Sequence, residues 1–197
     1  MKINPQVKDL VSNIKTFIGL GNFQVEYNDT KHNAGYWVVD ELSKRFDKNF
    51  EPANGSYVYA LNKKNNVVLV KPTTGMNSSG IAAKQVCHKW GISPSNLFVI
   101  LDDIDIPLGS LRIKPKGGDG CHKGLESIIK HLGTKSFPRI RFGISASDKI
   151  RPSEKYVLKP FKNNDKNLAE LMIAKTADAI QYLLDNNIEK TMNKFNS

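Results

Sequence analysis

Two hydrophobic patterns alternate along the chain and predict its secondary structure. Short apolar runs rich in β-branched residues predict strands at residues 15–20, 57–61, 67–71, 97–101, 111–114 and 139–144. Longer segments with apolar residues at helical spacing predict helices at residues 34–46, 79–90, 125–132 and 165–186. Because strands and helices alternate, we predict an α/β fold: one domain with a twisted, mixed and largely parallel sheet and helices on both of its faces.

The length of 197 residues is close to that of one ordinary domain. The predicted elements start at residue 15, so we expect an N-terminal extension over residues 1–15 and one domain over residues 16–197. No run of about 18 apolar residues, the length that a membrane span requires, occurs in the sequence. We therefore expect no membrane partner.

The N-terminal segment MKINPQVKDLVSNIK lacks the apolar stretch and the small-residue cleavage site of a secretory signal. The two cysteines, Cys87 and Cys121, make neither a disulfide framework nor a zinc set. We therefore expect a cytoplasmic protein. We also expect it to be a monomer.

The net charge is +10, and much of it lies in one stretch of the chain. Residues 112–151 contain ten lysines and arginines but three acidic residues. Such a cluster is compatible with a solvated lysine-rich surface. Its concentration favours a polyanionic partner, because clustered cations gain affinity by releasing the counterions of phosphates.

Polar segments follow several of the predicted strands. They occupy residues 19–33, 71–80, 101–109 and 114–124. Ligands of open α/β sheets bind beyond the carboxyl ends of the strands. We therefore expect these segments to meet in space although they lie far apart in the sequence.

His32 is a candidate general base, because histidine titrates near neutrality and can accept a proton from water. It could equally pack at the start of the helix that begins at Ala34. Asp102 is a candidate partner that would orient such a histidine. The segment with Asp102, Asp103 and Asp105 is also compatible with a solvated loop or with a magnesium site.

Asn22 and Asn77 each follow a predicted strand, and a side-chain amide there could hold a water and polarise a carbonyl. Asparagine is also common in turns and helix caps. The segment 117–124 is glycine-rich and could form a phosphate cradle or a mobile connection. No serine lies in a G-x-S-x-G motif, so a serine nucleophile has no support.

Several motifs occur together in one order. They are G-L-G-N…Y…T-K-H-N-A-G (19–35), P-T-T-G-M-N-S-S-G (72–80), D-D-I-D-I-P-L-G (102–109) and G-G-D-G-C-H-K-G-L (117–125), followed by R-I-R-F-G-I (139–144) and Y-V-L (156–158). With them the chain resembles the bacterial-type peptidyl-tRNA hydrolase family over nearly its whole length. The resemblance implies an enzyme that hydrolyses the ester between peptide and tRNA, peptidyl-tRNA as partner, and neither a metal nor another cofactor.

The resemblance also implies roles for single residues. His32 would be the general base and Asp102 its partner, while Asn22 and Asn77 would position the water and the ester carbonyl.

It further implies a set of residues that bind the substrate. Tyr27 and Met76 would line the cleft, and His122 would stand in a mobile loop over it. Lys114 and Arg141 would clamp the 5′-phosphate of the tRNA. Lys123 stands where the family has an asparagine that holds the substrate near the ester.

The sequence departs from the usual family pattern at six positions: Phe23, Gln24, Lys31, Gly75, Cys121 and Lys123. These changes surround the catalytic residues and leave the residues themselves in place. They keep open a second class of function, a catalytically weak or inactive RNA-binding paralogue of the same fold. A metal-dependent phosphoesterase is a third, more distant alternative.

Overall fold

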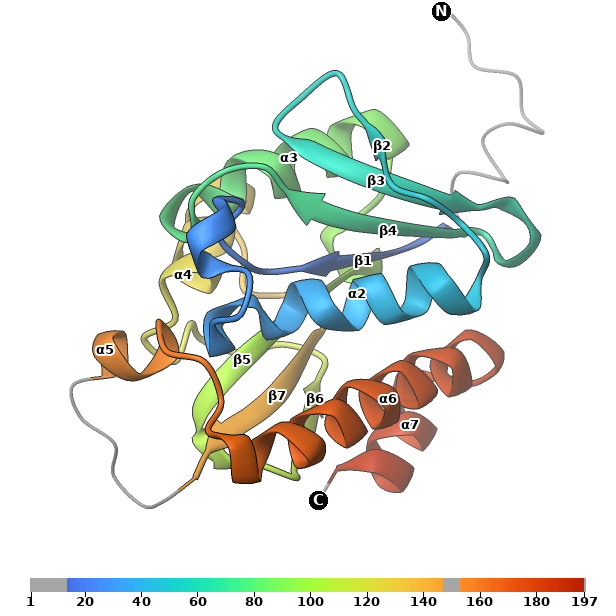
Figure 1. Ribbon diagram of the computed structural model, residues 1–197. Helices are drawn as coiled ribbons and strands as arrows, with labels where there is room; N and C mark the ends of the chain where they lie inside the picture. Colours follow the sequence, from blue (N-terminus) through green and yellow to red (C-terminus); the bar gives the residue numbers. More distant parts are fainter. Residues whose placement is uncertain (1–13, 147–152, 197) are drawn as a thin grey trace, which may run out of the picture.

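The strands of the computed structural model, which describes residues 14–146 and 153–196, form one sheet (Figure 1). They are β1 (Lys15–Gly19), β2 (Glu51–Pro52), β3 (Tyr57–Asn62), β4 (Val67–Pro72), β5 (Leu97–Pro107), β6 (Leu111–Lys114) and β7 (Arg139–Ser145). Their order across the sheet is β2-β3-β4-β1-β5-β7-β6. The central strands β4, β1, β5 and β7 are parallel, while β2, β3 and β6 add antiparallel pairs at the two edges. The predicted mixed, largely parallel sheet is confirmed.

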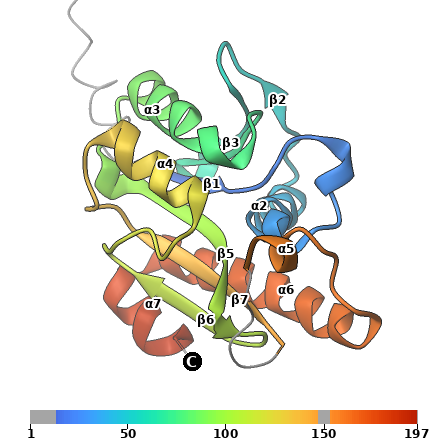
Figure 2. The ribbon, with the colours of Figure 1, turned by 90° about the vertical axis from the view of Figure 1, so that its left-hand side faces the viewer.

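Helices cover both faces of this sheet, as predicted. They are α2 (Ala34–Arg45), α3 (Ser79–Trp90), α4 (Lys123–Leu132), α5 (Ser153–Val157), α6 (Asn163–Asp185) and α7 (Ile188–Phe195). Figure 2 shows α3 and α4 on one side of the sheet and α2, α5 and α6 on the other. None of the helices in the described part of the chain combines the length and the apolar composition that a membrane crossing requires.

The alternation of side chains along the strands builds two cores, one on each face. Phe17, Ile100 and Phe142 belong to the core that includes α2 and α6. Ile18 and Val99, their sequence neighbours, belong to the core under α3 and α4. Because both faces are covered, the central strands contain runs of consecutive apolar residues, such as residues 67–70 of β4 and 97–101 of β5, and these runs made the strands recognisable from the sequence.

The amino end of α2 lies directly on the carboxyl ends of β1 and β5. A Cβ atom added to Gly35 would lie 2.4 Å from the carbonyl oxygen of Ile100 and 2.4 Å from the backbone nitrogen of Leu20. Only glycine permits this approach. It places the short 3-10 turn η2 (Lys31–Asn33) at the edge of the sheet where the strands end.

The structure differs from the prediction mainly at β5. This strand continues to Pro107, so Asp102 and Asp103 lie in the strand, opposite Phe142 and Gly143 of β7, and not in a loop. Two aspartates in succession are poor strand formers, and their polarity hid the extension. The buried carboxylates are tolerated because other side chains bind them, as described below.

Apart from the 3-10 turns, three short elements of the described residues were not predicted: β2, α5 and α7. In α7, Ile188, Met192 and Phe195 pack against the core at helical spacing, so the pattern was present but too short to identify. Residues 1–13 of the predicted N-terminal extension lie outside the described residues. The same holds for residues 147–152, which include Asp148, Lys149 and Arg151 of the basic stretch.

Candidate active site

Two cavities that share part of their lining lie at the carboxyl ends of β1, β4 and β5. The first has a volume of about 600 Å³ and the second of about 430 Å³. Their walls come from all four polar segments, so the prediction that these segments meet is confirmed. Both cavities are lined by His32, Lys123, Glu154 and Val157. His32 therefore stands at their junction.

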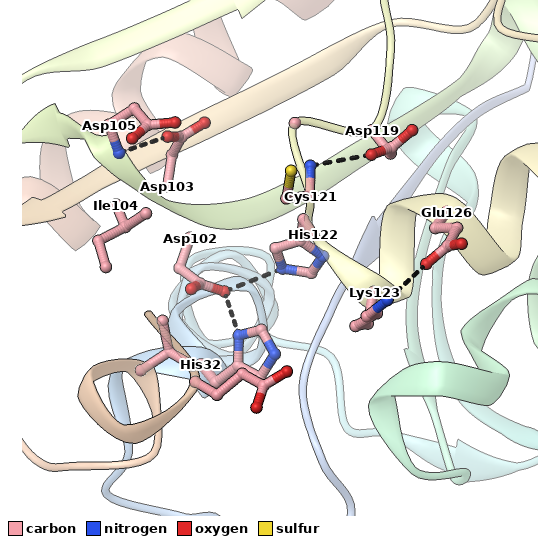
Figure 3. Close-up of a pocket in the computed structure, with 13 residues that line it drawn as sticks. His32, Asp102, Asp103, Ile104, Asp105, Asp119, Cys121, His122, Lys123 and Glu126 are labelled. Atoms are coloured by element: carbon pink, nitrogen blue, oxygen red, sulfur yellow. Dashed lines mark hydrogen bonds and ion pairs between the residues drawn. The ribbon is translucent and has the colours of Figure 1, made fainter. Parts of the chain in front are cut away.

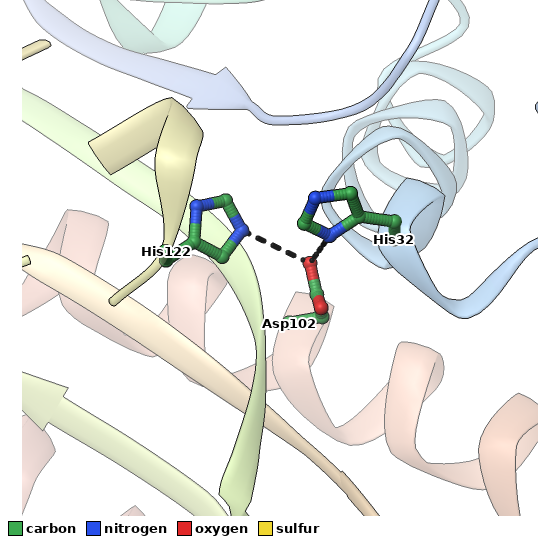
Figure 4. Close-up of side chains that lie close together, drawn as sticks. All are labelled: His32, Asp102 and His122. Carbon is green, nitrogen blue, oxygen red and sulfur yellow. Dashed lines mark hydrogen bonds and ion pairs between the residues drawn. The ribbon is translucent and has the colours of Figure 1, made fainter. Parts of the chain in front are cut away.

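His32 and Asp102, which lie 70 positions apart in the sequence, form a close pair. Nδ1 of His32 lies 2.8 Å from Oδ1 of Asp102 (Figure 4). His32 is the middle residue of η2, and Asp102 is a buried residue of β5 whose exposed fraction is 2%. A carboxylate accepts hydrogen bonds, so the imidazole donates from Nδ1 and keeps Nε2 as its acceptor.

His122 binds the same carboxylate oxygen from the other side. Its Nε2 lies 3.1 Å from Oδ1 of Asp102, and its ring centroid is 4.8 Å from that of His32 (Figures 3 and 4). His122 is the N-cap of α4, where Nδ1 accepts from the backbone N–H of Leu125 at 3.3 Å. This bond assigns the proton to Nε2. His122 is the last residue of the glycine-rich loop, directly before α4, and it lines the first cavity.

The shared carboxylate governs the titration of the site. Burial by itself would lower the pKa of His32, but the charge of Asp102 and the hydrogen bond outweigh burial, so this pKa is raised. Burial would raise the pKa of Asp102, and the two histidines outweigh it, so this pKa lies far below its usual range. Asp102 is therefore ionised at neutral pH, and it stabilises positive charge on His32.

A chain of amide hydrogen bonds fixes the other side of the site. The Asn33 side chain accepts from the backbone N–H of Asn22 at 2.8 Å and donates to the carbonyl oxygen of Asn22 at 3.1 Å. Oδ1 of Asn22 then accepts from the backbone N–H of Met76 at 2.8 Å. With its oxygen engaged in this way, the Asn22 amide has its two N–H groups left to donate to a ligand. The contribution of Asn33 had no sequence signal beyond its place after His32.

The remaining predicted cleft residues lie around the second cavity. Tyr27, Met76, Asn77 and Lys123 all line it, Met76 as a buried side chain and Asn77 as an exposed one on the 3-10 turn η4 (Met76–Ser78). The ammonium of Lys123 lies 3.2 Å from Oε2 of Glu126, and both side chains are more than half exposed.

Asp103 and Asp105 do not join Asp102 in one carboxylate cluster. Asp103 forms an ion pair with Arg141 and accepts from the backbone N–H of Asp105 at 2.9 Å. Within residues 14–146 and 153–196, the one set of three side chains that could ligate a metal is His32, Asp102 and His122. A Mg²⁺ ion prefers oxygen ligands, and this set offers two imidazoles and one carboxylate. The DDID segment therefore does not fit the magnesium site considered from the sequence.

The basic residues near the site fall into two groups. Arg112 and Lys114 on β6 are exposed, and Arg112 is the register partner of Arg141 on β7. Arg139 instead has an exposed fraction of 1%, and its guanidinium donates to four backbone carbonyls: Gly117, Gly118, Lys135 and Phe137. Arg139 was counted as part of the basic stretch, but it holds the base of the glycine-rich loop and offers no surface charge.

The glycine-rich loop before His122 contains left-handed backbone. Gly120 has φ of 58° and Cys121 has φ of 61°. A non-glycine residue in this region is strained. The backbone N–H of Cys121 is held by Oδ1 of Asp119 at 2.8 Å, which stabilises the turn.

Glu154 and Val157 of α5 are lining residues that the sequence reasoning missed. They lie on a five-residue helix, which is too short to carry a periodic signal.

Comparisons with known proteins are consistent over the whole domain. A family model described as Peptidyl-tRNA hydrolase matches residues 16–197. The peptidyl-tRNA hydrolase of Hydrogenobaculum sp. (strain Y04AAS1) is 40% identical over 185 residues, covering 93% of this chain and 98% of that protein. That of Methylacidiphilum infernorum is 42% identical over 183 residues, covering 91% and 96%. The crystal structure of peptidyl-tRNA hydrolase from Acinetobacter baumannii superposes with a TM-score of 0.87 at 28% identity, covering 94% of this chain and 96% of that one.

Proposed function

Since the chain belongs to the peptidyl-tRNA hydrolase family, it hydrolyses the ester between peptide and tRNA, and we propose that it does so with a water activated by His32. The observation that carries this mechanism is the pair of His32 and Asp102, with 2.8 Å between Nδ1 and Oδ1. It leaves Nε2 of His32 as the acceptor that a general base requires.

In this mechanism the water oxygen attacks the ester carbonyl carbon while Nε2 of His32 takes one proton from the water. The bond between that carbon and the terminal ribose oxygen then breaks, and the imidazolium returns the proton to the ribose oxygen. Asp102 stays ionised and stabilises the imidazolium between the two steps. An ester is more reactive than an amide, so a positioned water and one base suffice without a covalent intermediate.

Asn22 and Asn77 are the groups we assign to the carbonyl and the water. The Asn22 amide has its oxygen bound by Met76, so it acts on the substrate as a donor and polarises the ester carbonyl. Asn77 directly follows Met76 in the chain. It lines the second cavity, which is also lined by His32. The exposed Asn77 amide is free to hold the water.

We assign the two cavities to the end of the substrate that bears the peptide. Tyr27, Met76, His122 and Lys123 supply its walls. Lys114 and Arg141 are assigned to the tRNA phosphate. Lys114 is exposed on β6. Arg141 is partly exposed and forms an ion pair with Asp103.

The reaction is proposed to need no metal. To ligate an ion with Nε2, His122 would have to carry its proton on Nδ1, where the N–H of Leu125 already donates. Hydrolysis should therefore persist at full rate in EDTA. A rate that disappears in EDTA and returns with Zn²⁺ would make His32, Asp102 and His122 a metal centre.

We further propose that the enzyme is a cytoplasmic monomer. Its substrate, peptidyl-tRNA, is a product of ribosomes, which supports the location. Sedimentation of the purified protein tests the oligomeric state.

Replacement of His32 tests the mechanism. His32→Ala should lower the rate constant for single-turnover hydrolysis of peptidyl-tRNA by about 10²–10⁴ while the Kd for tRNA stays within a few-fold. His88→Ala, which removes an exposed histidine of α3, is the matched control and should retain full activity. Hydrolysis by His32→Ala within a few-fold of wild type would exclude His32 as the base.

A further inference from the structure

Lys31, the residue before His32, is a buried lysine with an exposed fraction of 4%. Its ammonium donates to the carbonyl oxygens of Lys159 at 3.2 Å and of Pro160 at 2.8 Å. Its backbone N–H donates to the same Lys159 oxygen at 3.2 Å. A buried cation is costly unless its hydrogen bonds are satisfied, so the position of this ammonium depends on these two carbonyls.

Two aromatic rings complete the surroundings of the ammonium. Nζ lies 4.2 Å from the ring centroid of Tyr156 and 5.2 Å from that of Phe161, which are cation–π distances. The Tyr156 hydroxyl donates to the carbonyl oxygen of Ile144, at the end of β7, at 2.8 Å. Burial lowers the pKa of Lys31, and the charge of Asp165 opposes this effect. Helix α5 is thus anchored to β7 through Tyr156, and the residues directly after it are anchored to Lys31.

Helix α5 and the residue after it form part of the wall of the cleft. Glu154 and Val157 of α5 line both cavities, and Leu158 lines the second one. The short helix packs against the turn that contains Lys31 and His32, and Figure 2 shows it beside the end of α2. Glu154 and Leu158 are exposed, so packing of these side chains contributes little to holding α5 in place.

We propose that Lys31 is a positioning residue: it fixes α5 at a set distance from His32 and so determines the width of the cleft that receives the peptide end of the substrate. The inference rests on the proposed function, because its kinetic test measures peptidyl-tRNA hydrolysis. Lys31 touches no reacting atom. Its effect reaches the substrate through the position of Glu154 and Val157, so it concerns substrate binding more than the chemical step.

Three variants separate the parts of this role. Lys31→Met keeps the length of the side chain and removes the charge and the donors. Lys31→Arg keeps a cation that can donate to both carbonyls and stack on Tyr156. Lys44→Met removes a lysine from an exposed position of α2 and is the matched control.

The experiment measures kcat and KM for peptidyl-tRNA hydrolysis, the pH profile of kcat, and hydrogen exchange in residues 154–161. For Lys31→Met we expect KM to rise about tenfold, kcat to stay within about twofold, the pH profile to stay unchanged, and exchange to accelerate. Lys31→Arg should return KM and exchange close to wild type, and Lys44→Met should change neither.

Other results would overturn the proposal. An unchanged KM, or unchanged exchange in residues 154–161, would show that Lys31 does not set the position of α5. A lower kcat with a shifted pH profile would show that Lys31 acts on His32 itself. If Lys31→Met does not fold, Lys31→Gln takes its place, with a smaller rise in KM expected. Failure of the proposed function is distinguishable, because wild type would then be inactive while the exchange measurement still tests the tether.

Discussion

Asp102→Asn is the replacement that most directly tests the electrostatics of the site. It keeps the size of a side chain whose exposed fraction is 2% and removes its charge. The asparagine oxygen can still accept from one or both histidines, so the fold of the site is retained. What disappears is the charge that stabilises the imidazolium of His32. A hydrogen bond to a charged group contributes about 1.5–3 kcal/mol, which corresponds to a kcat lower by about 10- to 150-fold.

The structure determines in which direction the pH profile of this variant shifts. In wild type the charge of Asp102 outweighs burial, so the pKa of His32 is raised. The neutral imidazole is the active base, so activity rises with pH through this raised pKa. In Asp102→Asn burial remains without the opposing charge, so the pKa of His32 should fall below its ordinary value. The rising limb should therefore move to lower pH while the plateau becomes lower.

The assay is single-turnover hydrolysis of peptidyl-tRNA between about pH 5 and 9, which covers the range of a histidine. Asp47→Asn, which replaces an exposed aspartate after α2 that lines neither cavity, is the control and should leave the rising limb and the plateau near those of wild type. If the rising limb of the pH profile of Asp102→Asn stays in place or moves to higher pH, the assignment of Asp102 as the partner of the base is refuted.

The other predictions concern the binding residues and the support of the glycine-rich loop. Lys123→Asn should raise kcat/KM about tenfold, because an amide supplies the acceptor that an ammonium lacks, and a fall in kcat/KM would show that the lysine belongs to a rearranged site. Lys114→Ala and Arg141→Ala should each weaken tRNA binding and reduce the slope of log K against log salt by roughly one, whereas unchanged slopes would place the phosphate site elsewhere. Arg139→Met should lower the free energy of unfolding in urea by about 2–4 kcal/mol because it removes a buried guanidinium that donates to four backbone carbonyls, and an effect no larger than that of the exposed control Arg112→Met would contradict this structural role.

The regular elements of the fold were set by local pattern. The helix over residues 79–90 and the strand over residues 111–114 have the predicted bounds, because apolar periodicity and helix-ending residues such as Gly91 act within a few positions. The polar segments after the strands also identified where the site lies, since the carboxyl ends of parallel strands share one edge of a sheet.

Tertiary structure alone decided how the charged groups of the site are paired. His32 and His122 lie 90 positions apart along the chain, yet they donate to one oxygen of Asp102. Nothing local specifies that arrangement. It follows from the extension of β5 and from the start of α4, which position these side chains through contacts that are distant in sequence.

The same holds for the buried cations. Nothing in the sequence indicates that Lys31 and Arg139 are buried, because charged residues are rarely buried. In the fold they are enclosed and bind backbone carbonyls of segments that border the cleft. Sequence determines that a lysine or an arginine is present, whereas its surroundings decide whether it meets solvent, a phosphate or the protein backbone. These surroundings form only when segments that are distant in the sequence pack together.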